Sequence, residues 1–421
     1  MKSRIRGVIA AGLIFAPGLT LAQTAAPGTA AAPATAPAAA APAAAPAAAP
    51  AWQQGRPAEM SGSTLAPHPP RLTATAPATI PTASLRVPEG FRVELWASGM
   101  PGVRAMALGP NGTVFAGTRV IGRVYAVRDQ GGQRTVSTLM QGLDQPSGVA
   151  VRDGALYVAA MHRVLRVDNI EANLASPQPV DLTAAFAQAT EPHHGWKHIE
   201  FGPDGRLYIN RGVPCNICDT DGERFALIES WRPDGTDRRM EARGVRNSVG
   251  FGFHPRTGQL WFSNHGRDWA GNDNPSDTLH VAARRGEHHG YPWCAGGFQD
   301  PAVNGRLCNE FPSPALILGP HVSPVGTHFY TGTAFPEQYR GAMFIPLAGS
   351  WNREQLSGFE VITVREGEGG RLIREPFLTG FRDDAARSFS GRPSGALTLP
   401  DGSLLISDQL NGAIYRITYP R

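Results

Sequence analysis

The densest run of side chains that could do chemistry is Glu191-Pro-His193-His194-Gly-Trp-Lys197-His198. An imidazole titrates near neutral pH, so His194 could act as a general base. Imidazoles and carboxylates also bind transition metals, so the three histidines and Glu191 could instead form a metal site. The residues that follow predict a strand, on which His194 and His198 would lie about 13 Å apart. This separation disfavours the metal site, but both interpretations stay open.

Two arginines precede segments that have the pattern of strands. Arg246 and Asn247 stand in Arg243-Gly-Val-Arg-Asn, and Arg392 stands in Ser390-Gly-Arg-Pro-Ser-Gly. A guanidinium group binds carboxylates in a bidentate way and stacks on planar rings. Two arginines that converge on one channel would be costly without an anion. The pattern therefore predicts a site for an anionic or quinone-like ligand.

The loop of residues 263–277 is rich in side-chain oxygens and contains Gly266, Arg267 and Asp273. Oxygen ligands suit Ca²⁺ better than zinc. Asx turns would explain the same composition without a metal, so this interpretation also stays open. Trp196, Trp293, Tyr330 and Trp351 lie in loops, where they could stack on a sugar ring or simply pack.

The first 84 residues have the composition of a processing signal and a spacer. Lys2, Arg4 and Arg6 precede an apolar stretch, Val8 to Leu21, and small residues follow it. This pattern predicts a secretory signal peptide over residues 1–22, too short for a membrane-spanning helix. Residues 23–84 are rich in Ala and Pro, which predicts a disordered linker. We expect a secreted or periplasmic protein with no transmembrane segment after processing.

Four cysteines are few for 421 residues. Cys215 and Cys218 have the spacing of a redox or zinc half-site, but no second pair of this kind exists. In a secreted protein disulfides are the expected state, so we predict Cys294–Cys308 and a local Cys215–Cys218 ring. A thioredoxin-like role is disfavoured because no βαβ pattern surrounds the pair.

A turn followed by an apolar strand recurs from residue 85 onward and must position these side chains. Clear copies are Gly109-Pro-Asn-Gly-Thr-Val-Phe-Ala and Gly202-Pro-Asp-Gly-Arg-Leu-Tyr-Ile. Asp-Gly and Asn-Gly supply the positive φ angles of tight hairpins. Six copies, about 56 residues apart, predict an all-β six-bladed propeller of four-stranded blades over residues 85–421.

Composition agrees with this fold class. Gly (49) and Pro (37) together make 86 of the 421 residues, and only 18% are charged, which excludes a coiled coil or a helical bundle. The net charge is 39 − 35 = +4, and loss of three leader cations would leave +1. Composition therefore gives no reason to expect a nucleic-acid partner.

The region from about Leu85 to Tyr419 resembles the soluble pyrroloquinoline quinone (PQQ)-dependent sugar dehydrogenases, in the L-sorbosone or aldose sugar dehydrogenase branch. The resemblance rests on six motifs that occur in the family's order: His194-Gly-Trp-Lys-His-Ile-Glu-Phe-Gly-Pro-Asp-Gly, Pro214-Cys-Asn-Ile-Cys, Arg243-Gly-Val-Arg-Asn-Ser-Val-Gly-Phe, His265-Gly-Arg-Asp-Trp-Ala-Gly-Asn-Asp, Gly349-Ser-Trp-Asn-Arg and Gly391-Arg-Pro. The family implies a six-bladed propeller that binds PQQ and Ca²⁺ at the mouth of its channel.

Carried over residue by residue, the resemblance makes His194 the catalytic base and gives Arg246 a catalytic role beside the quinone. It implies cofactor contacts from Arg246, Asn247 and Arg392, with Arg353 and Lys197 as further candidates. Gly266 and Arg267 would hold Ca²⁺ through backbone carbonyls, and Asp273 is a further candidate ligand. The sequence departs from the family at Ser394, Asn272 and the Ala348-Gly-Ser-Trp stretch.

The function that the resemblance implies is oxidation of a sugar at its anomeric hydroxyl or aldehyde, giving a lactone or acid. His194 would take the hydroxyl proton while a hydride passes to PQQ. Electrons would then leave to a quinone or cytochrome acceptor. Two alternatives are a metal-dependent lactonase or hydrolase on the same propeller and a non-catalytic binding propeller of the cell envelope.

Overall fold

The computed structural model describes residues 49–186 and 193–420. The predicted signal peptide, the first part of the predicted linker and Glu191 lie outside the described residues. In the described ranges, no helix has the length and apolar character needed to span a membrane.

Six antiparallel blades of four strands each make up most of residues 92–418, which confirms the predicted six-bladed propeller; one blade gains a fifth, parallel strand. The first blade contains β2 (Val103–Leu108), β3 (Val114–Thr118), β4 (Val124–Gln130) and β5 (Gln133–Met140). The second contains β6 (Gly148–Arg152), β7 (Ala155–Ala159), β8 (Val164–Val167) and β9 (Val180–Asp181). The third contains β10 (Ile199–Phe201), β11 (Leu207–Arg211), β12 (Leu227–Trp231) and β13 (Arg239–Arg243), and β17 (Glu287–His288) joins it in parallel.

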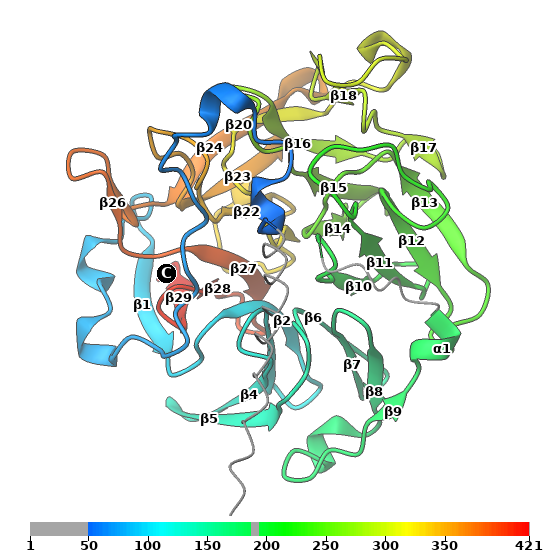
Figure 1. The fold of residues 1–421 in the computed structure, drawn as a ribbon. Helices are drawn as coiled ribbons and strands as arrows, with labels where there is room; N and C mark the ends of the chain where they lie inside the picture. The colour runs from blue at the N-terminus through cyan, green and yellow to red at the C-terminus, as the bar shows by residue number, and fades with distance from the viewer. Residues whose placement is uncertain (1–48, 187–192, 421) are drawn as a thin grey trace, which may run out of the picture. The chain divides into compact units, whose positions relative to one another are not determined.

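The remaining blades follow in chain order around the centre, from green to red in Figure 1. The fourth contains β14 (Phe251–Phe253), β15 (Leu260–Asn264), β16 (Ser276–Val281) and β20 (Leu316–Pro320). The fifth contains β21 (His328–Phe329), β22 (Met343–Leu347), β23 (Glu360–Glu366) and β24 (Leu372–Leu378). The sixth contains β27 (Pro393–Thr398), β28 (Leu404–Asp408), β29 (Ala413–Thr418) and, from the start of the propeller, β1 (Arg92–Ala97).

Short elements decorate the loops between these strands. They are α1 (Thr183–Phe186), η5 (Ile170–Ala172), η6 (Cys308–Glu310), η7 (Glu337–Tyr339), η8 (Glu368–Gly370), and the two-stranded pairs β18 (Cys294–Ala295) with β19 (Phe298–Gln299) and β25 (Arg382–Asp383) with β26 (Ser388–Phe389).

Each predicted hairpin joins the first and second strands of one blade. The second residue of every turn is a glycine with a positive φ angle: Gly112 (88°), Gly154 (75°), Gly205 (77°), Gly258 (69°), Gly341 (76°) and Gly402 (81°). A side chain would strain the backbone at these angles, which is why glycine recurs at this spacing.

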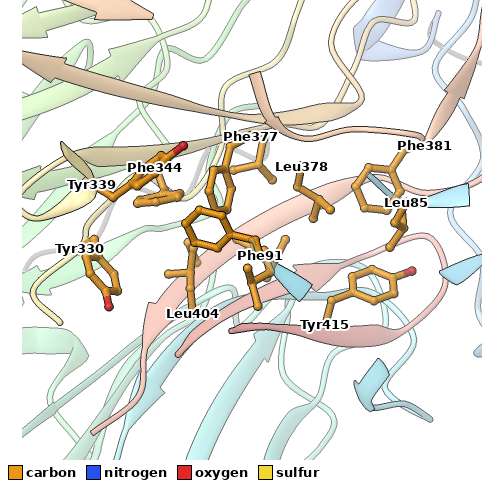
Figure 2. Packing of buried hydrophobic residues seen from close by; sticks show 14 of the residues in the cluster. Leu85, Phe91, Tyr330, Tyr339, Phe344, Phe377, Leu378, Phe381, Leu404 and Tyr415 are labelled. Carbon is orange, nitrogen blue, oxygen red and sulfur yellow. The ribbon is translucent and has the colours of Figure 1, made fainter. Parts of the chain in front are cut away.

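The ring of blades is closed by pairing between distant parts of the chain. β1 pairs antiparallel with β29, so residues near position 92 complete the sheet that ends the chain. The largest apolar cluster lies between the fifth and sixth blades, and Figure 2 shows Phe91 among Phe344, Phe377 and Leu404. Burial of these large rings stabilises the closure.

Residues 49–84, which we call the N-terminal strap, differ from the predicted linker because they pack on the propeller. The strap contains four single 3₁₀ turns, η1 (Ala51–Gln53), η2 (Ala58–Met60), η3 (Pro77–Thr79) and η4 (Thr82–Ser84). Ile80 is buried in the cluster between the fifth and sixth blades. A few separated apolar residues give no periodic pattern in the sequence, yet they can bury against a face that the rest of the chain has formed.

Candidate functional site

A cavity of about 460 Å³ opens where the inner strands of the blades begin. The inner strands are β2, β6, β10, β14, β21 and β27; β27, β2, β6 and β10 contact one another in that order, and β14 contacts β21, which contacts β27. Loops that enter the inner strands and loops that leave the second strands meet here. These loops, together with β2 and β16, supply the cavity's polar side chains, among them Arg104, Arg119, His193, His194, Arg246, Asn247, His265, Asp268, Asp277, His321, Asn352 and Arg392.

His194, predicted from the sequence to be a catalytic base, lies on the cavity wall just before β10. Its Nδ1–H donates to the carbonyl of Val213 at 3.0 Å, so Nε2 carries the lone pair. Its backbone has a φ angle of 51°, and a Cβ on Gly212 would meet the His194 Cβ at 2.5 Å. A strained residue packed on a glycine indicates that the ring position is tightly determined.

Burial lowers the pKa of His194 well below its ordinary value, and the positive charge of Arg246 lowers it further. The neighbouring His193 ring lies 4.0 Å away, and burial lowers its pKa to about 4. A lowered pKa keeps an imidazole neutral as the pH falls. Both histidines are therefore neutral at the pH values where most enzymes work.

We expect the His194 ring in the cofactor-free protein to show no titration around the ordinary midpoint of histidine, because burial lowers its pKa. Histidine-selective NMR measures this directly, because the ring carbon and proton shifts report protonation. A titration midpoint near the ordinary value of 6.5 would contradict the burial of this ring.

Arg246 is the most tightly held cation of the site. Its guanidinium donates to the Asn216 carbonyl at 2.9 Å, to the Asn216 Oδ1 at 2.8 Å and to the Gly266 carbonyl at 2.8 Å. Its Nη2 lies 3.4 Å from the Asp268 carboxylate. Asn216 is thus a positioning residue that sequence reasoning missed, although it stands inside the Cys215–Cys218 pair.

Three further arginines face the cavity: Arg104 is buried, and Arg119 and Arg392 are half-buried. Burial lowers the pKa of Arg104 to about 9 and the pKa values of the other two to about 10. Within residues 49–186 and 193–420, none of the three is paired with a carboxylate. Arg119 lies over the Trp196 ring at 3.7 Å, and Arg392 donates to the carbonyls of Ala348 and Gly349.

Arg104 and Arg119 were missed by sequence reasoning. Arg104 stands at the start of the inner strand β2, and Arg392 and Arg246 stand at or before the starts of β27 and β14. An arginine at the entrance of an inner strand thus recurs in three blades. That recurrence could have identified Arg104, whereas Arg119 follows β3 and carries no such signal.

Asn247 lies beside the cavity as predicted and has an unsatisfied polar atom. Its amide oxygen is buried and has no hydrogen-bond donor among the described residues. Asp268 and Asp277 add oxygens to the same wall, and burial raises the pKa of Asp277 to about 7. The cavity therefore offers excess positive charge, a neutral imidazole and an amide oxygen that lacks a donor.

Several predicted site residues lie away from this cavity. Arg353 pairs with Asp273 at 3.0 Å, and neither residue lines the cavity. Lys197 lies behind Trp196 and bonds to the Gly195 carbonyl. The Arg267 side chain points to Asp300. Strand periodicity does not fix side-chain direction in the loops that hold these residues. Spacing in the sequence therefore could not show that their side chains lie outside the cavity wall.

The alternative metal site is not assembled from the predicted histidines. The His198 side chain does not line the cavity. Its Nε2 lies 3.3 Å from the Phe251 carbonyl oxygen instead. Among the described residues no three His, Cys, Asp or Glu side chains gather as a metal site would require. Both predicted disulfides are present, Cys215–Cys218 and Cys294–Cys308.

Fold and site together define a six-bladed propeller with a cationic, histidine-bearing cavity at its centre. The family described as Glucose / Sorbosone dehydrogenase matches residues 233–388. An uncharacterised protein of Borreliella burgdorferi is 30% identical over 352 residues, which cover 79% of this chain and 90% of that protein. The chain belongs to the glucose/sorbosone dehydrogenase family.

More distant relatives share the architecture. A pyrroloquinoline quinone-dependent sugar dehydrogenase of Hypocrea jecorina is 26% identical over 210 residues, 41% of this chain and 46% of that protein. The holo form of the pyranose dehydrogenase PQQ domain from Coprinopsis cinerea aligns with a TM-score of 0.67 at 19% identity, covering 79% of this chain and 97% of that one. The soluble aldose sugar dehydrogenase of Escherichia coli aligns with a TM-score of 0.58 at 16% identity, covering 78% and 100%. At these identities the structures establish a common fold.

Proposed function

We propose that the protein is a PQQ-dependent sugar dehydrogenase that oxidises an anomeric hydroxyl to a lactone, or a hydrated aldehyde to an acid. The observation that carries this proposal is the cavity itself. It places the neutral imidazole of His194 beside the buried Arg104 and the half-buried Arg119 and Arg392, none of which has a carboxylate partner among the described residues. Buried cations of this kind are stabilised by an anionic ligand. The family membership and the sugar dehydrogenases among its relatives support the same class of reaction.

The cavity fits PQQ, a planar quinone with three carboxylates. Arg104, Arg119 and Arg392 would bind carboxylates, and the amide of Asn247 would meet a polar atom of the ligand. When bound, PQQ supplies the two-electron oxidant of the reaction. Arg353 and Lys197 are not part of this proposal, because both lie outside the cavity lining.

His194 performs the proton step of the proposed mechanism. With Nδ1–H fixed on the Val213 carbonyl, Nε2 is free to accept the proton of the sugar hydroxyl. Arg246, held on three sides by Asn216 and Gly266, stabilises negative charge that develops on oxygen. Its rigid attachment means that no reorganisation is needed at the moment of reaction.

Ca²⁺ remains part of the proposal at the backbone carbonyls of Gly266 and Arg267. Gly266, Asp268 and Asp277 line the cavity and offer oxygen donors of the type that Ca²⁺ prefers. Asp273 is excluded from this set by its ion pair with Arg353. We propose an extracytoplasmic location, which the two disulfides support, and an electron acceptor of the quinone or cytochrome class.

Reconstitution tests the proposed function. Purified protein is mixed with PQQ and Ca²⁺, the quinone absorbance is followed, and a panel of sugars is screened with an artificial electron acceptor. Sugar-dependent dye reduction that requires PQQ and is lost with a chelator is the expected result. Lactone hydrolysis without PQQ would favour the hydrolase alternative, and absence of both activities would favour a binding propeller.

Arg104→Met gives a separate check on the role of the uncompensated charge. Arg104 is 7% exposed and makes no ion pair among the described residues, so its loss removes a buried charge. We expect the cofactor-free protein to become more stable by about 1–3 kcal/mol and PQQ to bind more weakly. Thermal unfolding and PQQ titration measure the two effects. A less stable cofactor-free variant would show that the charge has a structural partner instead.

A further inference from the structure

The N-terminal strap contributes part of the wall of the cavity. Ala51, Trp52, Pro67 and His68 line the same space as His194 and the arginines. His68 donates from Nε2 to the Ser350 carbonyl at 2.8 Å, and its ring packs 4.5 Å from Phe389. Figure 1 shows the blue segment running over the central region of the blades, beside β22 and β23. The site is therefore bounded by residues that precede the propeller in the chain.

Trp52 forms an aromatic cluster with two tryptophans of the propeller. Its ring centroid lies 6.2 Å from that of Trp269 and 5.9 Å from that of Trp351, and the last two lie 5.4 Å apart. Trp269 also donates from Nε1 to the Trp52 carbonyl at 2.7 Å and has a φ angle of 64°. Trp269 is buried, while Trp52 and Trp351 are half-buried and line the cavity.

The strap is anchored to the residue that positions Arg246. The Asn216 amide N–H donates to the Gln54 side-chain oxygen at 2.8 Å, and the Asn216 side-chain nitrogen donates to the Gln54 carbonyl at 3.0 Å. The guanidinium of Arg56 lies over the Trp269 ring at 4.9 Å. The two hydrogen bonds of Gln54 and the cation–π contact of Arg56 hold the strap next to Trp52 in place. They thereby fix the position of Trp52 relative to Arg246.

We propose that Trp52 is a specificity-determining residue on which the sugar ring packs. This inference rests on the proposed function and extends it to a residue outside the propeller. One face of a pyranose ring presents C–H groups, and a large aromatic surface buries them while the hydroxyls stay on polar groups. Trp52 and Trp351 meet edge to face at 83°, so they form two sides of a corner that suits a ring-sized ligand.

Steady-state kinetics of the PQQ- and Ca²⁺-loaded full-length protein with D-glucose test this inference. We expect Trp52→Ala to raise KM on the order of tenfold, with kcat within twofold of the unchanged protein. Trp52→Phe keeps an aromatic face and should recover most of the difference. Leu65→Ala is the matched control, since Leu65 is a half-buried strap residue that does not line the cavity. It should behave as the unchanged protein does.

A binding measurement separates this inference from the proposed function. Methyl β-D-glucoside has a blocked anomeric hydroxyl, so its binding to the loaded protein can be followed by tryptophan fluorescence without turnover. Weaker binding to Trp52→Ala than to Leu65→Ala supports the stacking role even if no sugar is oxidised. Equal binding, absence of binding to the unchanged protein, or a lower KM in Trp52→Ala would overturn it; the last result would mean that the strap obstructs the site.

Discussion

His194→Ala is expected to lower kcat by about three orders of magnitude while PQQ still binds. General-base catalysis typically contributes a factor of about 10²–10⁴. His194 is 6% exposed, its imidazole is neutral, and its Nδ1–H is fixed on the Val213 carbonyl, so its Nε2 is the base that this substitution removes. Stopped-flow reduction of the loaded enzyme by D-glucose measures the step, and quinone absorbance measures cofactor occupancy.

His193→Ala is the matched variant for this prediction. The two rings lie 4.0 Å apart, and the pKa of each is lowered by burial. His193 lacks the hydrogen bond to Val213, and its Nε2 has no partner among the described residues. We expect its loss to change kcat less than tenfold. If His193→Ala is the more damaged variant, the base has been assigned to the wrong ring.

Arg392→Met is expected to weaken PQQ binding by about 10- to 100-fold. Loss of a charge-assisted hydrogen bond costs about 1.5–3 kcal/mol. Arg392 is anchored by the carbonyls of Ala348 and Gly349, which hold its guanidinium at the cavity wall. Titration of the cofactor-free protein with PQQ measures the dissociation constant, and circular dichroism checks that the variant folds.

Arg353→Met is the control for the loss of positive charge. The family resemblance offered both arginines as cofactor contacts, but Arg353 is paired with the exposed Asp273 and does not line the cavity. Its replacement should leave the PQQ dissociation constant unchanged. Equal losses in the two variants would mean that the contribution of Arg392 is a long-range effect of charge and not a contact.

Local sequence pattern was sufficient for the blades and insufficient for the strap. A hairpin is specified by adjacent residues, as in Asp153-Gly154, whose two positive φ angles join β6 to β7. The strap owes its place to contacts with residues more than a hundred positions away, such as the one between Gln54 and Asn216. No pattern within the strap records such a partner, and its Ala- and Pro-rich neighbourhood pointed to a spacer.

The same limit explains which site residues could be predicted. His194, Arg246, Asn247 and Arg392 stand next to inner strands, whose first residues converge at the cavity by the geometry of the propeller. Arg353 lies in an irregular loop after β22, where neither periodicity nor topology fixes the direction of a side chain. Cavity residues next to strand ends could therefore be predicted from the sequence, whereas the positions of residues on long loops could not.

The pairing of β1 with β29 has a consequence for the order of events during biosynthesis. Arg392 stands directly before β27 in the blade that these two strands complete, and β29 is the last strand of that blade in chain order. A nascent chain that still lacks its last strand cannot close the ring, so it cannot present the full set of arginines in one cavity. We therefore expect the ligand proposed for this cavity to bind only after β29 has paired with β1, and removal of β29 to abolish that binding.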